Sequence, residues 1–362
     1  MSEQINEKKH FTVALIANSS IKGGAEQYLY DLYRELKERD AWKVVLVGSL
    51  PNWPPELGVQ ISTGKPRKFT RRLPILLQVF QSLYYPFRVR KIVSKLKPDL
   101  IHMQFMREKL LLPALLSKYC KVLWTEHGPL PDDFSNIPLA VFKWQSKHST
   151  IISISSGVKE SLNFHGIDSF HIPNPIPNTP SYLSIEKVRE SFASTERFKA
   201  LYLGRIHKNK RLELLIEVAK FLPKVDFFIA GEGEYQEKLL NQAPKNVTFL
   251  GFVQDVKSLI YSANVLVMTS GKSAREGSPL VMLDARSLGI PVLVASDSHA
   301  ATEAESLGCY IFQPNVNDLL AELSAIINDY KFQPLDEKIR AERTFLNWST
   351  QHSLFMHGLL KK

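Results

Sequence analysis

The chain has 362 residues, of which 44% are hydrophobic and 23% are charged. This composition is typical of a soluble globular protein and excludes a largely disordered chain, and the length predicts two domains of about 150 residues each. The charge is uneven, because 46 Lys and Arg against 36 Asp and Glu give a net charge of +10, and no acid lies between Glu56 and Asp99.

The cysteine count and the hydrophobic segments exclude further classes of protein. Cys120 and Cys309 are too few for a disulfide framework or a cysteine-rich zinc site, so we expect a reducing compartment. The first ten residues are charged and contain no apolar segment, and we expect no secretory signal. No stretch reaches the roughly 20 apolar residues that cross a bilayer.

Short β-branched runs alternate with helical periodicity along the first half of the chain. We predict an amphipathic helix over 25–39 and buried strands at 11–18, 43–47, 100–103, 122–125 and 151–154. This alternation predicts a doubly wound parallel sheet. Residues 171–180 then carry four prolines in ten residues, which predicts a connection between domains because proline does not fit a helix interior or a central strand.

The same alternation begins again after the connection. We predict a helix over 212–221 and strands at 199–203, 226–230, 247–250, 265–268 and 292–294, and the tail from 336 to 360 has helical apolar periodicity. The expected fold is therefore α/β, with two Rossmann-like domains at 1–175 and 176–335 and a C-terminal helical segment, 336–362, packing back towards the first domain. Ligands of such sheets bind at the carboxyl ends of the strands, so we expect a cleft between the domains.

Positive charge gathers after the first strand of the second domain. Gly204 and Arg205 follow that strand, and Lys208, Lys210 and Arg211 stand at the entrance of the next helix. Cations and backbone N–H groups at a helix N-terminus form an anion site. A solvated basic turn has the same sequence signature, so the run by itself leaves both interpretations open.

A loop of small residues follows another strand of this domain. Gly277 and Ser278 leave their N–H groups free to approach a phosphate, and a helix begins near Pro279. Glu276 stands in the loop, and Asp284 lies eight residues beyond it on the helix. Because a carboxylate repels phosphate, these acids fit best as acceptors of hydrogen bonds from sugar hydroxyls.

Several segments of the second domain occur together in a recognisable order. They are Gly204-Arg205 with Lys210, FIAGEGEY at 228–235, FLGFVQDV at 249–256, ANVLVMTS at 263–270 and EGSPLVMLDARSLGIPVLVASD at 276–297. Looser matches in the first domain are 23–26, PDLIHMQF at 98–105, TEHG at 125–128, ISISSGVKESL at 152–162 and IPNP at 172–175. In this order and spacing the set resembles a family 4 retaining glycosyltransferase with the GT-B fold.

The resemblance implies a nucleotide-diphosphate sugar as donor, bound by the second domain, and an acceptor bound by the first. Arg205 and Lys210 would contact the diphosphate, and Glu276 and His127 the transferred sugar. The family holds the nucleotide ribose with a second glutamate; here Asp284 is one methylene shorter, so ribose contact requires a closer helix or a bridging water. The other implied donor-binding residues are Gly23, Gly24, Gly204, Gly231, Phe252, Val253, Gly277, Ser278, Pro279 and Leu280.

The expected chemistry follows from the groups that the sequence lacks. There is no Asp-x-Asp pair for a divalent metal, so fixed cations would neutralise the leaving group and no metal cofactor is expected. The family has no consistently placed carboxylate nucleophile of the kind that double displacement requires, and none stands out here; the resemblance therefore implies front-face transfer with retention. Two alternatives remain: a sugar-nucleotide epimerase of the same architecture, and a non-catalytic subunit that binds nucleotide sugar.

The basic stretch 65–97 interleaves its cations with aromatic and aliphatic residues. This pattern predicts an amphipathic segment on an anionic membrane surface, and a solvated helix pair with extended Lys and Arg is the main alternative. No nucleic-acid recognition module is present, and we expect no nucleic-acid partner. We therefore expect a cytoplasmic enzyme, peripheral on the inner face of the membrane, whose acceptor is a glycan or a lipid-linked glycan of the cell surface.

Overall fold

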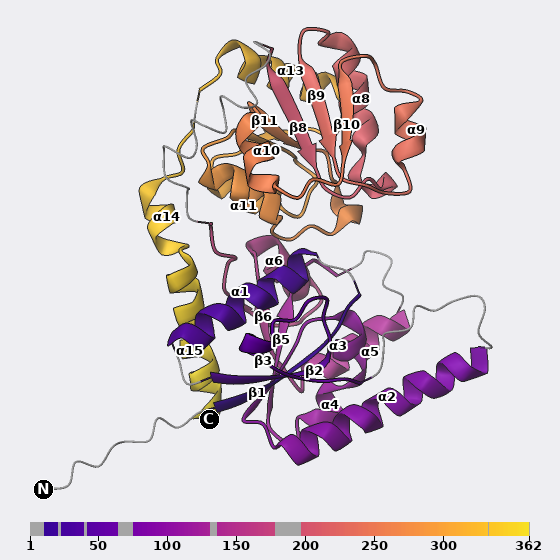
Figure 1. The fold of residues 1–362 in the computed structure, drawn as a ribbon, viewed down its shortest axis with the longest axis vertical. Coiled ribbons are helices and arrows are strands. Elements are labelled where there is room, and N and C mark those ends of the chain that lie inside the picture. The colour runs from indigo at the N-terminus through magenta and orange to yellow at the C-terminus, as the bar shows by residue number, and fades with distance from the viewer. Residues whose placement is uncertain are drawn as a thin grey trace, which may run out of the picture.

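The computed structural model describes residues 11–20, 23–39, 42–63, 75–130, 136–177, 197–331 and 333–361. The first ten residues, residues 65–74 of the basic stretch and residues 178–180 of the proline-rich connection lie outside the described residues. The described chain forms two α/β domains, one above the other in Figure 1, each built around one parallel sheet. This confirms the predicted fold class.

The first domain contains a seven-stranded sheet with the order β3-β2-β1-β4-β5-β6-β7. Its strands are β1 (Phe11–Asn18), β2 (Trp42–Ser49), β3 (Gly58–Ile61), β4 (Leu100–Met103), β5 (Lys121–Glu126), β6 (Thr150–Ser153) and β7 (Phe170–His171). Every neighbouring pair is parallel. The carboxyl ends of the strands therefore meet at one edge, which faces the second domain (Figure 1).

Helices cover both faces of this sheet. Right-handed crossovers place α1 (Gly24–Arg39) on one face, because the chain steps from β1 to β2 in one direction and from β3 to β7 in the other. The opposite face carries α2 (Ile75–Leu96), α3 (Met106–Leu111), α4 (Pro113–Leu116), α5 (Asn136–Ser146) and α6 (Ser156–Phe164). The short helix η1 (Pro55–Leu57) precedes β3.

The second domain contains a six-stranded sheet with the order β10-β9-β8-β11-β12-β13. Its strands are β8 (Lys199–Leu203), β9 (Asp226–Ala230), β10 (Val247–Gly251), β11 (Val265–Met268), β12 (Val292–Ala295) and β13 (Tyr310–Phe312). Its helices are η2 (Lys208–Lys210), α8 (Leu212–Phe221), α9 (Gln236–Leu240), α10 (Val256–Ser262), η3 (Lys272–Ala274), α11 (Leu280–Ser287), α12 (Ala301–Ser306) and α13 (Val316–Asn328).

The C-terminal segment forms two helices, α14 (Glu337–Glu342) and α15 (Phe345–Leu360). Thr344 starts the second helix, because its hydroxyl accepts a hydrogen bond from the Asn347 amide at 3.1 Å. Trp348 and Met356 of α15 are buried in the core of the first domain, beside α1 (Figure 1). The chain thus returns to its first domain.

The chain crosses between the domains twice, near Ile176 and near Arg343, and hydrogen bonds connect the two crossing segments. The Ile176 amide donates to the Arg343 carbonyl at 2.7 Å, and the Arg343 guanidinium donates twice to the Asn174 carbonyl, at 2.9 and 2.7 Å. Arg343 also forms a buried ion pair with Glu303 of α12 at 2.7 Å. These bonds hold the two crossing segments side by side. Within the described residues, no helix has the length and apolarity that crossing a membrane requires.

Candidate active site

Interlocked glycine turns form the floor of the candidate site at the carboxyl ends of β8, β9 and β10. The Gly204 amide donates to the Ala230 carbonyl at 3.0 Å, and the Gly231 amide donates to the Gly251 carbonyl at 2.7 Å. Gly231 has φ +129°, and a Cβ there would lie 1.9 Å from the Gly204 carbonyl oxygen. Only glycine fits, so the backbone beside Arg205 is fixed.

Lys210 and Glu276 meet at this floor although 66 residues separate them. The Lys210 ammonium, buried at 9% exposure, forms an ion pair with one carboxylate oxygen of Glu276. The other oxygen, Oε2, is buried and has no hydrogen-bond partner, so it can accept a hydrogen bond from a ligand. Arg205 is exposed and forms no ion pair within the described part of the chain. Its guanidinium is available to an anion.

Arg211, which the sequence groups with the anion-binding cations, serves a different purpose. Its guanidinium holds Asp297 by two bonds of 2.8 and 2.7 Å and donates to the Thr269 carbonyl at 2.9 Å. A Cβ at Gly271 would lie 2.7 Å from its Cζ. Thr269 in turn donates its hydroxyl to the Lys210 carbonyl at 2.6 Å. Arg211 therefore fixes the turn that carries Lys210.

The loop around Glu276 lies directly against the first domain. A Cβ at Gly277 would stand 2.4 Å from Val158 Cγ2 and 2.7 Å from the His127 carbonyl oxygen. Arg275 donates from Nε to the Pro129 carbonyl at 2.9 Å. The loops at the carboxyl edges of the two sheets are therefore in contact, which brings the backbone of His127 to the loop of the predicted donor site.

Two further predicted residues approach each other across the domain boundary. A Cβ at Gly24, the first residue of α1, would lie 3.5 Å from Leu280 Cδ1, at the first residue of α11. Gly23 precedes it, and its amide donates to Glu26 Oε2 at 3.0 Å. The N-termini of these two helices therefore face each other, and both direct positive dipole ends towards the same space.

His127 is held as a neutral ring. Its Nε2 is 2.8 Å from Gln104 Oε1, and Gln104 donates its amide to the Ala25 carbonyl at 2.6 Å. Because that amide nitrogen is the donor, Oε1 must accept, so His127 carries its proton on Nε2 and offers Nδ1 as an acceptor. Burial, with the positive charge of Lys109, holds the pKa of His127 well below its usual value.

Glu126, beside His127, is not part of the open site. Its carboxylate forms a buried ion pair with Lys109 at 2.8 Å, and the same ammonium lies 5.5 Å from the centre of the Trp124 ring. Removing one partner would leave a buried charge without compensation. This acid is therefore structural.

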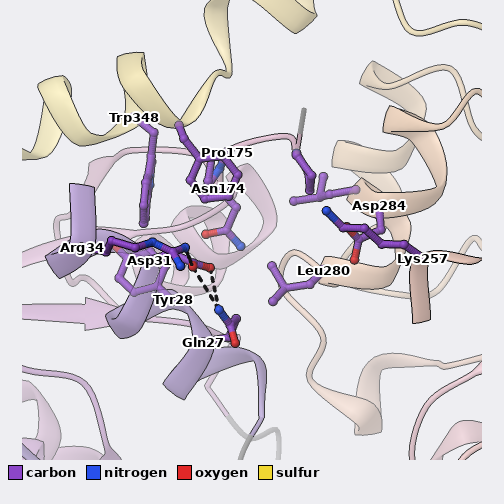
Figure 2. Close-up of a pocket in the computed structure, with 13 residues that line it drawn as sticks. Gln27, Tyr28, Asp31, Arg34, Asn174, Pro175, Lys257, Leu280, Asp284 and Trp348 are labelled. Carbon is purple, nitrogen blue, oxygen red and sulfur yellow. Dashed lines mark hydrogen bonds and ion pairs between the residues drawn. The ribbon is translucent and has the colours of Figure 1, made fainter. Parts of the chain in front are cut away.

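Asp284 lies in a different environment from Glu276, beside a cavity of about 490 Å³ between the domains (Figure 2). Lys257 of α10 stands next to it, and Tyr28, Asp31 and Arg34 of α1 face it across the cavity (Figure 2). Burial raises the pKa of Asp284 to about 6, Lys257 opposes this rise and Asp31 adds to it. Glu276 and Asp284 therefore lie in different parts of the interdomain site.

The remaining predicted residues lie around the same edge of the sheet. Phe252 is 77% exposed after β10, and Val253 beside it packs on the core of the second domain. Ser278 is buried, and its carbonyl accepts from Asn174 Nδ2 at 3.4 Å. Pro279 is the N-cap residue of α11. Within the described chain, no three His, Cys, Asp or Glu side chains are grouped so as to hold a metal ion.

Sequence reasoning missed two residues that shape the site. Gln104 directly follows β4, and the rule that ligands bind at the carboxyl ends of parallel strands could have found it. Tyr28 packs edge-to-face on His127 at 4.7 Å between ring centres and is 2.6 Å from His352 Nε2 of α15. Its bond to His352 depends on which residue of the returning C-terminal helix faces α1, and no local pattern in the sequence indicates that pairing.

With two facing parallel sheets and a cationic loop site between them, the architecture is that of a GT-B protein. The family model described as Glycosyltransferase Family 4 matches residues 22–178, and the one described as Glycosyl transferases group 1 matches residues 184–342. The chain belongs to this family of glycosyltransferases.

Curated relatives agree with this membership, and a solved structure agrees with the fold. A sulfoquinovosyl transferase from Arabidopsis thaliana is 31% identical over 46% of this chain and 34% of its own length. The O-antigen biosynthesis glycosyltransferase WbnH from Escherichia coli is 30% identical over 45% of this chain and 47% of its own. The matches thus span about a third to a half of these relatives. Anabaena HepE, solved with UDP and glucose, has a TM-score of 0.77 at 18% identity and covers 96% of this chain and 100% of its own.

Proposed function

We propose that the protein transfers a sugar, with retention of configuration and without a metal, from a nucleotide diphosphate sugar to a glycan or lipid-linked acceptor. The observation that carries the proposal is the meeting of Lys210 and Glu276 at the domain boundary, with Arg205 unpaired beside the glycine turn. Two cations and a carboxylate at one place suit a substrate that joins a diphosphate to a hydroxyl-rich ring. Family membership supports the same chemistry.

The diphosphate would lie against Arg205, Lys210 and the N-terminus of α11. As the bond between the anomeric carbon and the phosphate oxygen breaks, negative charge grows on that oxygen, and fixed cations stabilise it at no cost of reorganisation. The Lys210 ammonium is the stronger contributor, because burial at 9% exposure weakens solvent screening around it. Arg205, on the exposed side, would close on the outer phosphate oxygens.

The hydroxyl groups of the transferred sugar would donate hydrogen bonds to two acceptors in the site that have no protein partner. These are the unpartnered Oε2 of Glu276 and Nδ1 of the neutral His127 ring. The Lys210 ion pair occupies Glu276 on one side, which makes its carboxylate a poor nucleophile. In the proposed front-face step, the acceptor oxygen bonds to the anomeric carbon, the phosphate oxygen leaves from the same face, and that oxygen takes the acceptor proton.

The proposal also covers the class of acceptor substrate and the location of the enzyme in the cell. The names of the relatives, an O-antigen biosynthesis enzyme and a sulfoquinovosyl transferase, favour a cell-surface glycan or a glycolipid as product. An acceptor of that kind is carried on a lipid, which suits a cytoplasmic enzyme that is peripheral on the inner face of the membrane. The basic stretch 65–97 would provide the contact.

The first test is thermal unfolding in the presence of UDP, GDP, ADP and their sugars. A ligand at 100 times its dissociation constant stabilises the folded state by about 2.7 kcal/mol, so the correct nucleotide raises Tm by several degrees. The product of the matching donor with lipid-linked glycans is then identified by NMR, where the anomeric coupling reports retention. Donor epimerised in the absence of acceptor, or no response to any nucleotide, would overturn the proposal.

A further inference from the structure

Glu303 of α12 is a buried carboxylate that the proposed chemistry does not use. It is 5% exposed, and its Oε1 forms an ion pair with the Arg343 guanidinium at 2.7 Å. Burial of a carboxylate is costly unless a cation and hydrogen bonds compensate for the loss of water. The contacts of Glu303 therefore matter, and they lead in two directions.

The first contact leads to both segments that cross between the domains. Arg343 stands two residues before α15, whose Trp348 and Met356 are buried in the core of the first domain. The same guanidinium donates to the Asn174 carbonyl at 2.9 and 2.7 Å. Because α12 belongs to the second domain, Glu303 fixes the two crossing segments against that domain.

The second contact leads to the loop of Glu276. Ser278, two residues beyond Glu276, is 7% exposed, and its hydroxyl faces the Glu303 carboxylate. Burial raises the pKa of Glu303, and the charge of Arg343 and the Ser278 hydroxyl both oppose that rise. Asn174 donates from Nδ2 to the Ser278 carbonyl at 3.4 Å. The junction therefore contacts Ser278 through both its side chain and its backbone.

The atoms at this contact favour a close approach of the loop to Glu303. In the described part of the chain, neither Ser278 Oγ nor Glu303 Oε2 has a bonded partner, and both are buried. A hydroxyl donor and a carboxylate acceptor that face each other are stabilised when they approach and are left without compensation when they separate. The loop is therefore drawn towards Glu303.

The position of Ser278 determines where helix α11 begins. The next residue, Pro279, has φ −65°, which its ring fixes. The Pro279 carbonyl accepts from the Met282 and Leu283 amides, at 3.0 and 3.3 Å, and so belongs to the first turn of the helix. A shift of Ser278 therefore moves both the N-terminus of α11 and the neighbouring Glu276.

We propose that Glu303 is a positioning residue of the transferase, which acts through Ser278 to set Glu276 and the N-terminus of α11 against the donor. The proposal deepens the proposed function and rests on it. Its loss should lower kcat, because a displacement of about 1 Å can cost about 100-fold in rate. The donor KM should change little, since Arg205 and Lys210 still hold the diphosphate in the ground state.

A double-mutant cycle separates this indirect role from direct contact with the donor. Glu303→Gln and Ser278→Ala should each lower kcat about tenfold with the donor KM within threefold, and the double variant should be no slower than the slower single variant. If the Ser278 hydroxyl bound the donor directly, its loss would still count in Glu303→Gln, and the losses would multiply to about 100-fold. Multiplied losses, or wild-type kcat in Glu303→Gln, overturn the proposal.

Amide hydrogen exchange tests the positioning without a transfer assay. In Glu303→Gln and in Ser278→Ala, the Met282 and Leu283 amides should exchange at least tenfold faster than in the wild type. Exchange at the wild-type rate in both variants refutes the proposal. Should Glu303→Gln not fold, Ser278→Ala, which leaves every charge in place, carries the exchange test and the comparison of kcat with KM.

Asp99→Asn is the control for a general loss of stability. Asp99 accepts from the Thr12 amide at 2.7 Å, at the amino edge of the first sheet, and its replacement should lower Tm while α11 exchange and kcat stay as in the wild type. Equal effects of Asp99→Asn and Glu303→Gln on α11 exchange would refute the positioning role. Faster exchange in Glu303→Gln alone, with no sugar transfer by the wild type, would uphold the link from Glu303 to α11 and overturn only the proposed function.

Discussion

Replacing Lys210 by methionine isolates the charge that the proposed mechanism needs. Methionine keeps most of the unbranched apolar stem, which fills the buried part of the site, and removes the ammonium. The turn itself is held from elsewhere, by the Thr269 hydroxyl on the Lys210 carbonyl and by Arg211 on Asp297. The change therefore deletes a cation and leaves the backbone in position.

The expected loss follows from where the charge acts. Lys210 is buried and would touch the oxygen on which charge develops, so its removal should resemble the loss of an oxyanion donor, about 10² to 10³ in kcat. This corresponds to about 2.7 to 4 kcal/mol of transition-state stabilisation. The KM for the donor should change far less, because Arg205 and the α11 N-terminus still hold the ground-state diphosphate.

The assay is steady-state nucleotide release with saturating acceptor and varied donor, which yields kcat and the donor KM. Lys208→Met is the matched control, because Lys208 lies in the same short helix, is exposed and forms no ion pair within the described residues; it should retain wild-type kcat. In Lys210→Met the carboxylate of Glu276 loses its ion-pair partner. The double variant Lys210→Met/Glu276→Gln removes that carboxylate as well, and shows how much of the loss in kcat comes from displacement of the Glu276 side chain. A Lys210→Met enzyme that binds donor and turns over within threefold of wild type would refute the assignment.

Three further changes test other parts of the site. Burial raises the pKa of Asp284 to about 6, so its negative charge opposes folding once the pH exceeds the unfolded pKa near 4. Asp284→Asn should therefore raise Tm at pH 8, and calorimetry should show this gain lost by pH 4. The same change should weaken donor binding. Gly277→Ala inserts a methyl against the His127 carbonyl and should lower kcat at least tenfold with unchanged circular dichroism. Asp297→Asn frees Arg211 and should lower kcat about tenfold with little change in donor Kd, and Asp297→Glu should partly restore it.

The central strands could be predicted because parallel strands with helices on both faces are continuously apolar. The buried runs of β1 and β11 show this directly. The edge strands β3, β7 and β13 were missed. For β3 and β7 the reason is complementary: their residues are half-buried or exposed, so burial imposes no apolar pattern. Their existence depends on pairing with β2 and β6, which the residues of the edge strands do not encode locally.

The candidate site was predictable residue by residue but not as a set of pairs. The cationic turn after β8 and the loop of small residues indicated Lys210 and Glu276, and the family resemblance indicated His127. All three follow strands at the carboxyl edge of a parallel sheet, which is where ligands bind. The direction in which each charged side chain points is a tertiary property. Arg211 turns to Asp297, 86 residues away, and Glu126 turns to the buried Lys109, so neighbours in sequence end in unrelated environments.

The ion pairs also explain how an empty site tolerates its own charges. Without donor, the buried ammonium of Lys210 would be costly unless compensated, and one oxygen of Glu276 supplies that compensation. A bound diphosphate would offer Lys210 a second anion, while a sugar hydroxyl would satisfy the unpartnered Oε2 of Glu276. The same pair then holds both halves of the donor, one on each side of the bond that breaks. Loss of either partner should therefore impair transfer more than donor binding, which a non-catalytic nucleotide-binding subunit would have no reason to require.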